Sequence, residues 1–288
     1  MNKINKIFFK SKDFVKLLRS PQNKQIKFKS IKEVRREFQK EEWNILLKKT
    51  LEIKNKKILI EDVDEMYNDF NKNIIYYSNK SFYQDIVKHV QKKYIKIFFK
   101  TIQPYLNKES KNSLVELGSG YGSKICNLAI RFDKMNYDIN YFAGEISSKG
   151  RKITDIISNN MKQNIKTFEF SYFNKKNYNF IPKNSIVFSS YSMPYMKKLD
   201  IRFFKYLSLR KPKVIINFEP FFESHNADTQ YGIACRNYII KNDYCRNHLS
   251  YFKKMHKNNK IVIINYKPNI YGSNPMLPIS QIEWRFLN

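Results

Sequence analysis

Apolar residues recur at helical spacing in the first third of the chain and at strand spacing in the rest. Residues 31–55 and 81–106 have long helical periodicity and almost no glycine or proline. After residue 112, short β-rich runs follow one another, most of them separated by helix-compatible stretches. These runs cover residues 113–117, 139–144, 165–170, 185–190, 213–218, 260–266 and 279–286. The pattern predicts a helical region up to about residue 108 and an α/β domain after it.

The order of these runs also predicts how the strands pair. Strands that alternate with helices form a mostly parallel sheet with helices on both faces. The last two runs are joined by KPNIYGSNPMLP, which contains two turn clusters and has no room for a crossover helix. We therefore expect the final two strands to pair antiparallel.

Composition supports a globular protein but leaves the meaning of its charge open. The chain has 288 residues, of which 42% are apolar and 16% aromatic, enough for one medium catalytic domain with an appendage. It carries 54 Lys and Arg against 25 Asp and Glu, a net charge of +29. Such a charge favours an anionic partner such as nucleic acid, yet it is spread along the chain rather than focused. We therefore attribute more of it to amino-acid usage than to a selected function.

The cysteines and the amino terminus indicate a cytoplasmic protein. Three cysteines without a C-x-x-C pair indicate neither a disulfide framework nor a zinc site, and we predict no metal. The apolar run of residues 7–9 stops at Lys10, which is too short for a signal peptide or a membrane span. Residues 4–19 have the spacing of an amphipathic helix, which either docks on its own domain or lies on an anionic membrane surface.

Three of the seven glycines stand together in the stretch LVELGSGYGSK, at positions 118, 120 and 122. The stretch runs from a predicted strand into a helix-like segment. Glycine is needed where such a turn requires unusual backbone angles or where a ligand approaches the backbone closely. The spacing fits neither the dinucleotide pattern G-x-G-x-x-G nor a Walker loop.

The pattern E-x-G-x-G-x-G, formed here by Glu116, Gly118, Gly120 and Gly122, resembles motif I of class I S-adenosylmethionine (SAM)-dependent methyltransferases. The resemblance implies a Rossmann-like sheet of seven strands with an antiparallel last strand. It places a methyltransferase domain at residues 109–288, after a helical N-terminal extension at residues 1–108. It also implies SAM as cofactor, with the glycines admitting the methionine moiety and Glu116 meeting the cationic end of the ligand through its surroundings.

Other strand ends supply the rest of the predicted cofactor site. Glu145 ends the second strand of this domain, 25 positions after Gly120, where a carboxylate accepts hydrogen bonds from ribose hydroxyls. Ser171 and Tyr172 follow the third strand, where this fold places contacts to adenine. Ser190 ends the fourth strand and completes the predicted cofactor-binding set.

The acceptor site is predicted at the ends of the fourth and fifth strands. Glu219, Glu223 and His225 follow the fifth strand, and a hydroxyl acceptor needs such a base as it attacks the methyl group in line. Tyr191 and Ser192 follow the fourth strand as predicted substrate-binding residues. The sequence Ser-Met-Pro-Tyr at 192–195 departs from the [DNS]-P-P-[FY] motif at its first proline, which disfavours N-methylation of adenine or glutamine.

The C-terminal part is similar to a group of bacterial sugar O-methyltransferases, over roughly residues 112–288. The features that carry this resemblance are Phe218-Glu219-Pro220 with Glu223, Asn242-Asp243-Tyr244 with Arg246-Asn247, and Asn274-Pro275 with Pro278 and Ser280. It implies O-methylation of a sugar or small polar metabolite, such as a surface-glycan precursor, and adds Asn274 to the substrate-binding set. An RNA methyltransferase and a non-catalytic SAM-fold scaffold that binds a partner through residues 1–100 are the alternatives. The oligomeric state stays open.

Overall fold

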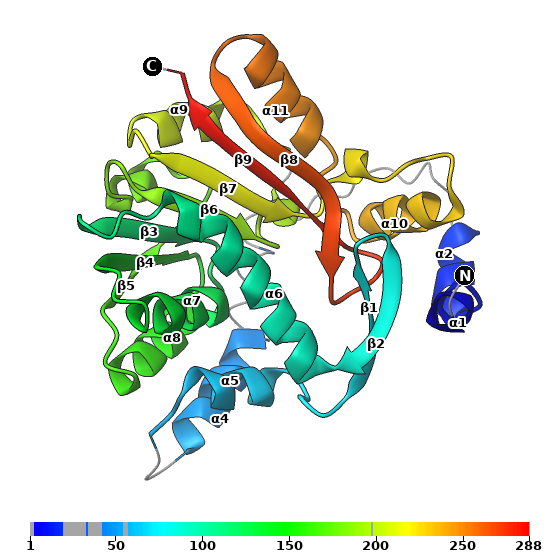
Figure 1. The fold of residues 1–288 in the computed structure, drawn as a ribbon, viewed down its shortest axis with the longest axis horizontal. Helices are drawn as coiled ribbons and strands as arrows, with labels where there is room; N and C mark the ends of the chain where they lie inside the picture. Colours follow the sequence, from blue (N-terminus) through cyan, green and yellow to red (C-terminus); the bar gives the residue numbers. More distant parts are fainter. Residues whose placement is uncertain (1–2, 20–32, 34–41, 54–56, 197, 288) are drawn as a thin grey trace.

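The computed structural model describes residues 3–19, 33, 42–53, 57–196 and 198–287, and all of their strands form one sheet. The sheet has nine strands in the order β2-β1-β8-β9-β7-β6-β3-β4-β5 (Figure 1). The strands are β1 (Asn73–Ser78), β2 (Ser81–Ile86), β3 (Asn112–Leu117), β4 (Ile139–Glu145), β5 (Ile165–Glu169), β6 (Ile186–Ser190), β7 (Val214–Glu219), β8 (Ile261–Gly272) and β9 (Ile279–Phe286).

Helices cover the sheet on both faces. They are α1 (Lys3–Phe9), α2 (Lys12–Leu18), α4 (Trp43–Glu52), α5 (Ile60–Tyr67), α6 (Val87–Ile102), α7 (Ser123–Asp133), α8 (Ser148–Asn160), α9 (Ile201–Ser208), α10 (Gln230–Lys241) and α11 (His248–Lys257). Short 3₁₀ turns follow β6 and β7, namely η4 (Met193–Tyr195) and η5 (Phe222–Ser224).

The predicted α/β fold is confirmed for the last seven strands. Strands β3 to β7 are parallel, whereas β9 pairs antiparallel with both β7 and β8. Counted from β3 along the chain, the spatial order 3-2-1-4-5-7-6 is the Rossmann-like arrangement with an antiparallel last strand. The carboxyl ends of β3, β4, β5 and β6 therefore meet at one edge of the sheet.

Alternating side chains of the central strands pack into two apolar cores, one on each face of the sheet. In β3, Leu114 packs with α6 and α7, whereas Val115 packs with α9 and α11. In β7, Ile215 and Ile216 separate in the same way between the two cores. Since successive side chains of a strand point to opposite faces, a strand buried on both faces reads as a continuous apolar run. The burial of both faces is therefore the reason that the sequence pattern predicts these strands.

Strands β1 and β2 correct two predictions, the helical N-terminal extension at residues 1–108 and the helix at residues 81–106, because both strands belong to the sheet. Helix α6 occupies residues 87–102, but residues 81–86 form β2, so the helical prediction is wrong there. The two strands form a hairpin through Asn79 and Lys80, both at positive φ (48° and 65°), and β1 adds to the edge of β8. The residues of this hairpin are rich in Ile, Tyr and Phe, which favour strands. Pairing in a sheet therefore stabilises them more than isolated helical turns would. Of the helix predicted at 31–55, α4 covers 43–52, and residues 31, 32, 34–41, 54 and 55 lie outside the described residues.

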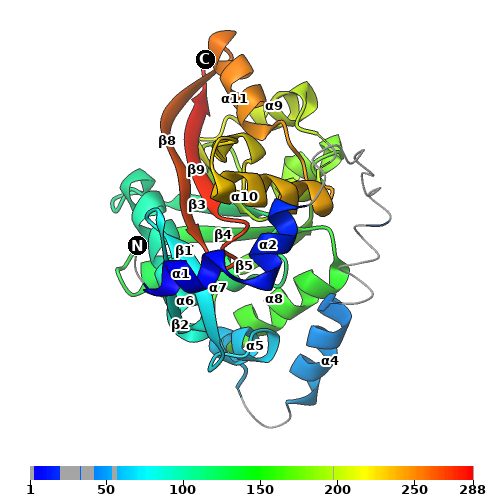
Figure 2. The same cartoon turned by 90° about the vertical axis from the view of Figure 1, so that its right-hand side faces the viewer.

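Helices α1 and α2 dock on the rest of the chain. Phe8, Phe14 and Leu17 are buried with Phe82 of β2 and with Tyr231 of α10. Both views show these helices beside the β1–β2 hairpin and α10 (Figures 1 and 2). Their apolar stripe therefore packs on the protein itself. Within the described residues, no helix combines the length and apolar character needed to cross a membrane.

Candidate functional site

A cavity of about 830 Å³ opens where the carboxyl ends of four parallel strands converge. Its walls include the loops after β3, β4, β5 and β6, together with residues of α4, α5 and α6. Of the predicted site residues, it is lined by Gly118, Gly120, Glu145, Ser171, Tyr172, Ser190, Tyr191 and Ser192. Ligands of open α/β sheets bind outside the carboxyl ends of the strands, so this cavity is the candidate site.

The glycine loop after β3 adopts backbone angles that favour glycine. Gly118, Gly120 and Gly122 have φ of 74°, 58° and 82°. Side chains of this protein also approach them closely. A Cβ on Gly118 would lie 2.3 Å from Ser192 Cβ, and one on Gly120 would lie 3.1 Å from the ring of Trp43. The loop thus needs glycine for its own conformation and packing, and its contact with a cofactor stays a prediction.

Glu145 at the end of β4 holds the glycine loop in place. Its Oε2 accepts a hydrogen bond from the Gly120 amide at 2.9 Å, and its Oε1 accepts one from the Ser147 amide at 2.8 Å. Burial raises the pKa of this carboxyl to about 6, against the opposing effect of these two amides. Each carboxylate oxygen accepts two hydrogen bonds, so each keeps one position for a ligand hydroxyl.

Glu116 and Gly122 do not line the cavity. Glu116 is fully buried, and its Oε2 accepts a hydrogen bond from the Ile125 amide at 3.1 Å in the first turn of α7. Burial raises the pKa of this carboxyl to about 8. Gly122 faces Thr154, whose Oγ1 would lie 2.6 Å from an added Cβ. Glu116 thus holds the start of α7 from a buried position outside the cavity wall.

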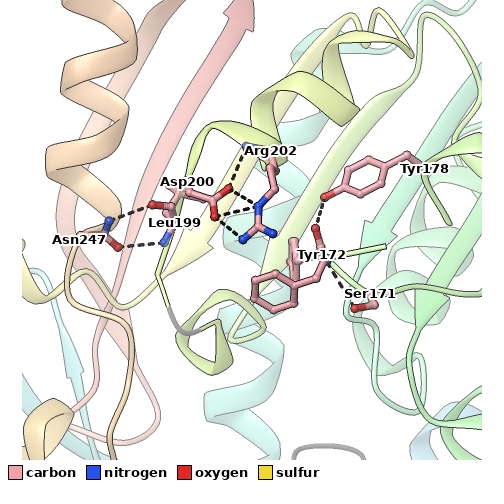
Figure 3. Close-up of polar contacts among 8 residues, drawn as sticks. Ser171, Tyr172, Tyr178, Leu199, Asp200, Arg202 and Asn247 are labelled. Carbon is pink, nitrogen blue, oxygen red and sulfur yellow. Dashed lines mark hydrogen bonds and ion pairs between the residues drawn. The ribbon is translucent and has the colours of Figure 1, made fainter. Parts of the chain in front are cut away.

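The loops after β5 and β6 meet in one wall of the cavity. The Tyr172 backbone is fixed by Tyr178, whose hydroxyl donates to the Tyr172 carbonyl at 3.0 Å (Figure 3). The Tyr172 hydroxyl lies 2.7 Å from Ser192 Oγ, which joins the two loops. The hydroxyl of Tyr94 in α6 lies 2.8 Å from Ser190 Oγ. Hydroxyl groups therefore dominate this wall of the cavity.

Tyr191 and Ser192 are both in the wall, and Asn274 is not. Tyr191 has a φ of 51°, and its hydroxyl donates to the Leu277 carbonyl at 2.9 Å, which ties the loop after β6 to the turn before β9. Asn274 lies in that turn, where its side chain accepts a hydrogen bond from the Met276 amide. Its neighbour Ser273 lines the cavity instead.

The three predicted catalytic residues lie outside the cavity wall. Glu219 is fully buried in β7, paired with Ser280 of β9, and burial raises the pKa of its carboxyl to about 7. It accepts hydrogen bonds from Ser189 Oγ at 2.7 Å, from the Ser192 amide at 3.1 Å and from Ser192 Oγ at 3.2 Å. Glu219 therefore reaches the cavity only through Ser192.

Glu223 and His225 lie farther from the cavity along the chain after β7. Glu223 accepts a hydrogen bond from the Ser250 amide at 3.0 Å, in the first turn of α11. His225 is 2% exposed, and burial, followed by the charge of Arg236, lowers the pKa of its ring to about 4. Their catalytic role stays a prediction that the geometry of the cavity does not support.

The N-terminal region supplies cavity residues that the sequence analysis did not identify. Trp43 of α4 covers Gly120, and its ring packs at a centroid distance of 5.3 Å from Tyr121. Asp64 of α5 lines the cavity while being only 4% exposed. One signal was present: Ile60, Val63 and Asp64 share one helical face, so an acid stands at a core-facing position.

No family model and no curated protein matches this chain. Among solved structures, it is similar to geranyl diphosphate C-methyltransferase from Streptomyces coelicolor A3(2), crystallised with Mg²⁺, geranyl diphosphate and S-adenosyl-L-homocysteine. That match has 9% identity and a TM-score of 0.47, and covers 67% of this chain and 79% of the other. A SAM-dependent methyltransferase from Clostridium acetobutylicum matches at 10% identity and a TM-score of 0.47, and the match covers 68% of this chain and 92% of the other. TrmK from M. capricolum matches at 12% identity and a TM-score of 0.38, and the match covers 66% of this chain and 67% of the other.

Proposed function

We propose that this protein is a SAM-dependent methyltransferase that methylates a hydroxyl of a sugar or another small polar molecule. The observation that carries the proposal is the convergence of three features on one cavity: the positive-φ glycine loop after β3, the buried Glu145 after β4 and the hydroxyl-rich loop after β6. A nucleoside ligand needs a carboxylate for its ribose, and Glu145 lines the cavity at this edge of the sheet together with Gly118 and Gly120.

The residues present fit SAM as the cofactor. Glu145 keeps one acceptor position on each oxygen for the two ribose hydroxyls, and Ser171 and Tyr172 line the wall beside it for the base. Tyr94, Tyr172 and Tyr195 surround the cavity with aromatic rings, which attract a cation through their faces. When bound, SAM supplies an electrophilic methyl group on a cationic sulfur.

Ser192 and Glu219 offer a route for the proton of the acceptor. The acceptor hydroxyl donates to Ser192 Oγ, and the Ser192 proton moves to Glu219 Oε1, 3.2 Å away. The freed acceptor oxygen would then be able to take the methyl group that bound SAM would supply, with the neutral thioether as the leaving group. A carboxyl with a pKa of about 7 is matched to this task near neutral pH. Glu219 thus acts through Ser192, and Ser192 is the residue that touches the substrate.

The size and charge of the cavity favour a small polar acceptor. Its volume of about 830 Å³ lies in the range of small-molecule sites. Its lining carries nearly balanced charge although the whole chain has a net charge of +29. The basic lining residues are Lys88, Lys92, Lys124, Arg131 and Lys134, and the acidic ones are Glu42, Glu61, Asp64 and Glu145. The positive charge of the chain is therefore not concentrated at this site.

Methyl transfer from radiolabelled SAM to a panel of acceptors tests the proposal. Nucleotide sugars, free glycans and total RNA are incubated separately with the wild-type protein and with Ser192→Ala. We expect label in a sugar fraction that depends on Ser192. Label in RNA, with binding that weakens steeply as salt rises, would instead support an RNA methyltransferase. SAM binding without transfer to any acceptor would point to a scaffold.

A further inference from the structure

Asp64 is a buried carboxylate that has no role in the structure of the sheet. It stands on α5, outside the predicted methyltransferase domain, and lines the cavity with 4% of its surface exposed. Burying a charged side chain costs free energy unless an opposite charge or several hydrogen bonds replace its water.

The partners of Asp64 are all neutral. Its Oδ1 accepts hydrogen bonds from the Tyr121 hydroxyl at 2.8 Å and from Ser123 Oγ at 2.7 Å. Its Oδ2 accepts one from Asn127 Nδ2 at 3.1 Å. Within the described part of the chain, no cation forms an ion pair with it, although the charge of Lys124 acts on it from farther away. Four acceptor positions are available on a carboxylate, so Oδ2 keeps one.

A carboxylate buried this far is seldom left without a cation. Desolvation is the largest effect on Asp64, and it raises the pKa of the carboxyl despite the three hydrogen bonds and Lys124. A cationic ligand in the cavity would supply the missing charge. The donors that fix Asp64 belong to the glycine loop and to the first turns of α7, so such a ligand would also contact that loop.

The other carboxylates near the cavity are less suited to this task. Glu116 is sealed behind the glycine loop and does not line the cavity. Glu145 already holds the amides of Gly120 and Ser147 and lies at the strand end where a ribose is expected. Glu42 and Glu61 are exposed, where water weakens their attraction for a cation.

We propose that Asp64 binds the α-ammonium group of the methionine moiety of SAM, so that helix α5 of the N-terminal region forms part of the cofactor site. The proposal rests on the proposed function. It replaces Glu116 by Asp64 as the carboxylate at the cationic amino-acid end of the ligand. Tyr121 and Ser123 are then positioning residues that hold the carboxylate toward the cavity.

Three ligands that share one nucleoside test this assignment by calorimetry. SAM and S-adenosylhomocysteine carry the ammonium group, whereas 5′-methylthioadenosine has the same nucleoside and sulfur without the amino-acid chain. We expect Asp64→Asn to weaken binding of the first two ligands about ten- to a hundredfold, the range for a charge-assisted hydrogen bond. Binding of 5′-methylthioadenosine should change less than twofold.

Control variants separate recognition from folding. Tyr121→Phe removes one donor to Asp64 but keeps the carboxylate, so it should preserve the ratio of the affinities for S-adenosylhomocysteine and 5′-methylthioadenosine. Asp64→Ser leaves room for water beside Tyr121 and Ser123 and provides the same comparison if the Asn variant does not fold.

Equal weakening of all three ligands in the Asp64 variants would overturn the proposal, because Asp64 would then act only by docking α5. Unchanged binding of all three would overturn it as well and place the ammonium elsewhere. If the wild-type protein binds none of the three, the proposed function itself fails. Selective loss of the two ligands that carry the ammonium group supports the proposal.

Discussion

Replacing Glu145 tests the cofactor site at the carboxylate that joins β4 to the glycine loop. In Glu145→Ala, the Gly120 and Ser147 amides lose their acceptor, and the ribose hydroxyls of a bound nucleoside lose theirs. A hydrogen bond to a charged group contributes about 1.5–3 kcal/mol before water compensates. Two such bonds, reduced by the water that replaces them, give a net loss of about 2–4 kcal/mol. This corresponds to a roughly 30- to 700-fold weaker affinity for SAM.

The pH dependence of binding provides a second measure of the same carboxylate. Burial raises its pKa to about 6 in the protein without ligand. Only the ionised form accepts both hydroxyls, so SAM affinity should fall as the pH drops through about 6 in the wild type. In Glu145→Gln this dependence should disappear, because an amide does not titrate in this range.

Isothermal calorimetry between pH 5 and pH 8 measures both effects. Glu169→Gln is a matched control, since Glu169 pairs with Glu145 in the sheet register but does not line the cavity. A dissociation constant within threefold of the wild type in Glu145→Ala, with circular dichroism showing a folded protein, would refute the ribose assignment. The same dependence on pH in Glu145→Gln would show that another group is responsible for it.

Three further predictions address catalysis and the packing around the glycine loop. Ser192→Ala should lower kcat at least tenfold in methyl-transfer assays with little change in SAM affinity, the low end of the effect of a positioned proton acceptor. The wild-type kcat should rise as the pH increases through about 7, where Glu219 loses its proton, and Glu219→Gln should abolish that rise in a pH–rate profile. Gly118→Ala should destabilise the fold by about 2–5 kcal/mol in urea unfolding, because a Cβ there overlaps Ser192 on a backbone at positive φ.

The sheet could be predicted from the sequence because its signals are local. Strands such as β6 and β7 are buried on both faces and therefore begin with consecutive apolar residues, at positions 186–188 and 214–216. The glycine loop could be predicted because three glycines within five positions indicate a backbone at positive φ, and all three glycines adopt it. The antiparallel end of the sheet followed from the length of one connection, and β8 and β9 confirm it.

The β1–β2 hairpin lacked a local signal. Its two-residue turn is Asn79-Lys80, and a lysine at φ 65° replaces the glycine that marks such hairpins. Its strand β1 joins the sheet by pairing with β8, nearly 200 positions later in the chain. Because that pairing is a long-range contact, the periodicity of residues 81–106 alone favoured a helix.

Glu219, one of the three predicted catalytic residues, lies outside the cavity wall for a geometric reason. Sequence reasoning places residues at the end of a strand beside the ligand, and Glu219 is the last residue of β7. However, Glu219 still pairs with Ser280, because the antiparallel β9 continues past the end of β7. That covering strand leaves the carboxylate inside the sheet, where it accepts hydrogen bonds from Ser189 of β6 and from Ser192 in the loop after β6.

The contact between Gly118 and Ser192 links the two halves of the candidate site. A side chain at position 118 would occupy the space of Ser192 Cβ, so the glycine permits the loop after β6 to lie directly against the loop after β3. Glu219 holds the Ser192 amide from behind, and the Leu117 carbonyl lies 2.9 Å from Ser192 Oγ. A change that moves the glycine loop therefore moves the hydroxyl proposed to receive the proton of the acceptor. Substitutions at position 118 should consequently lower both SAM affinity and kcat. Substitutions at Glu145 should mainly lower SAM affinity, and substitutions at Glu219 should mainly lower kcat.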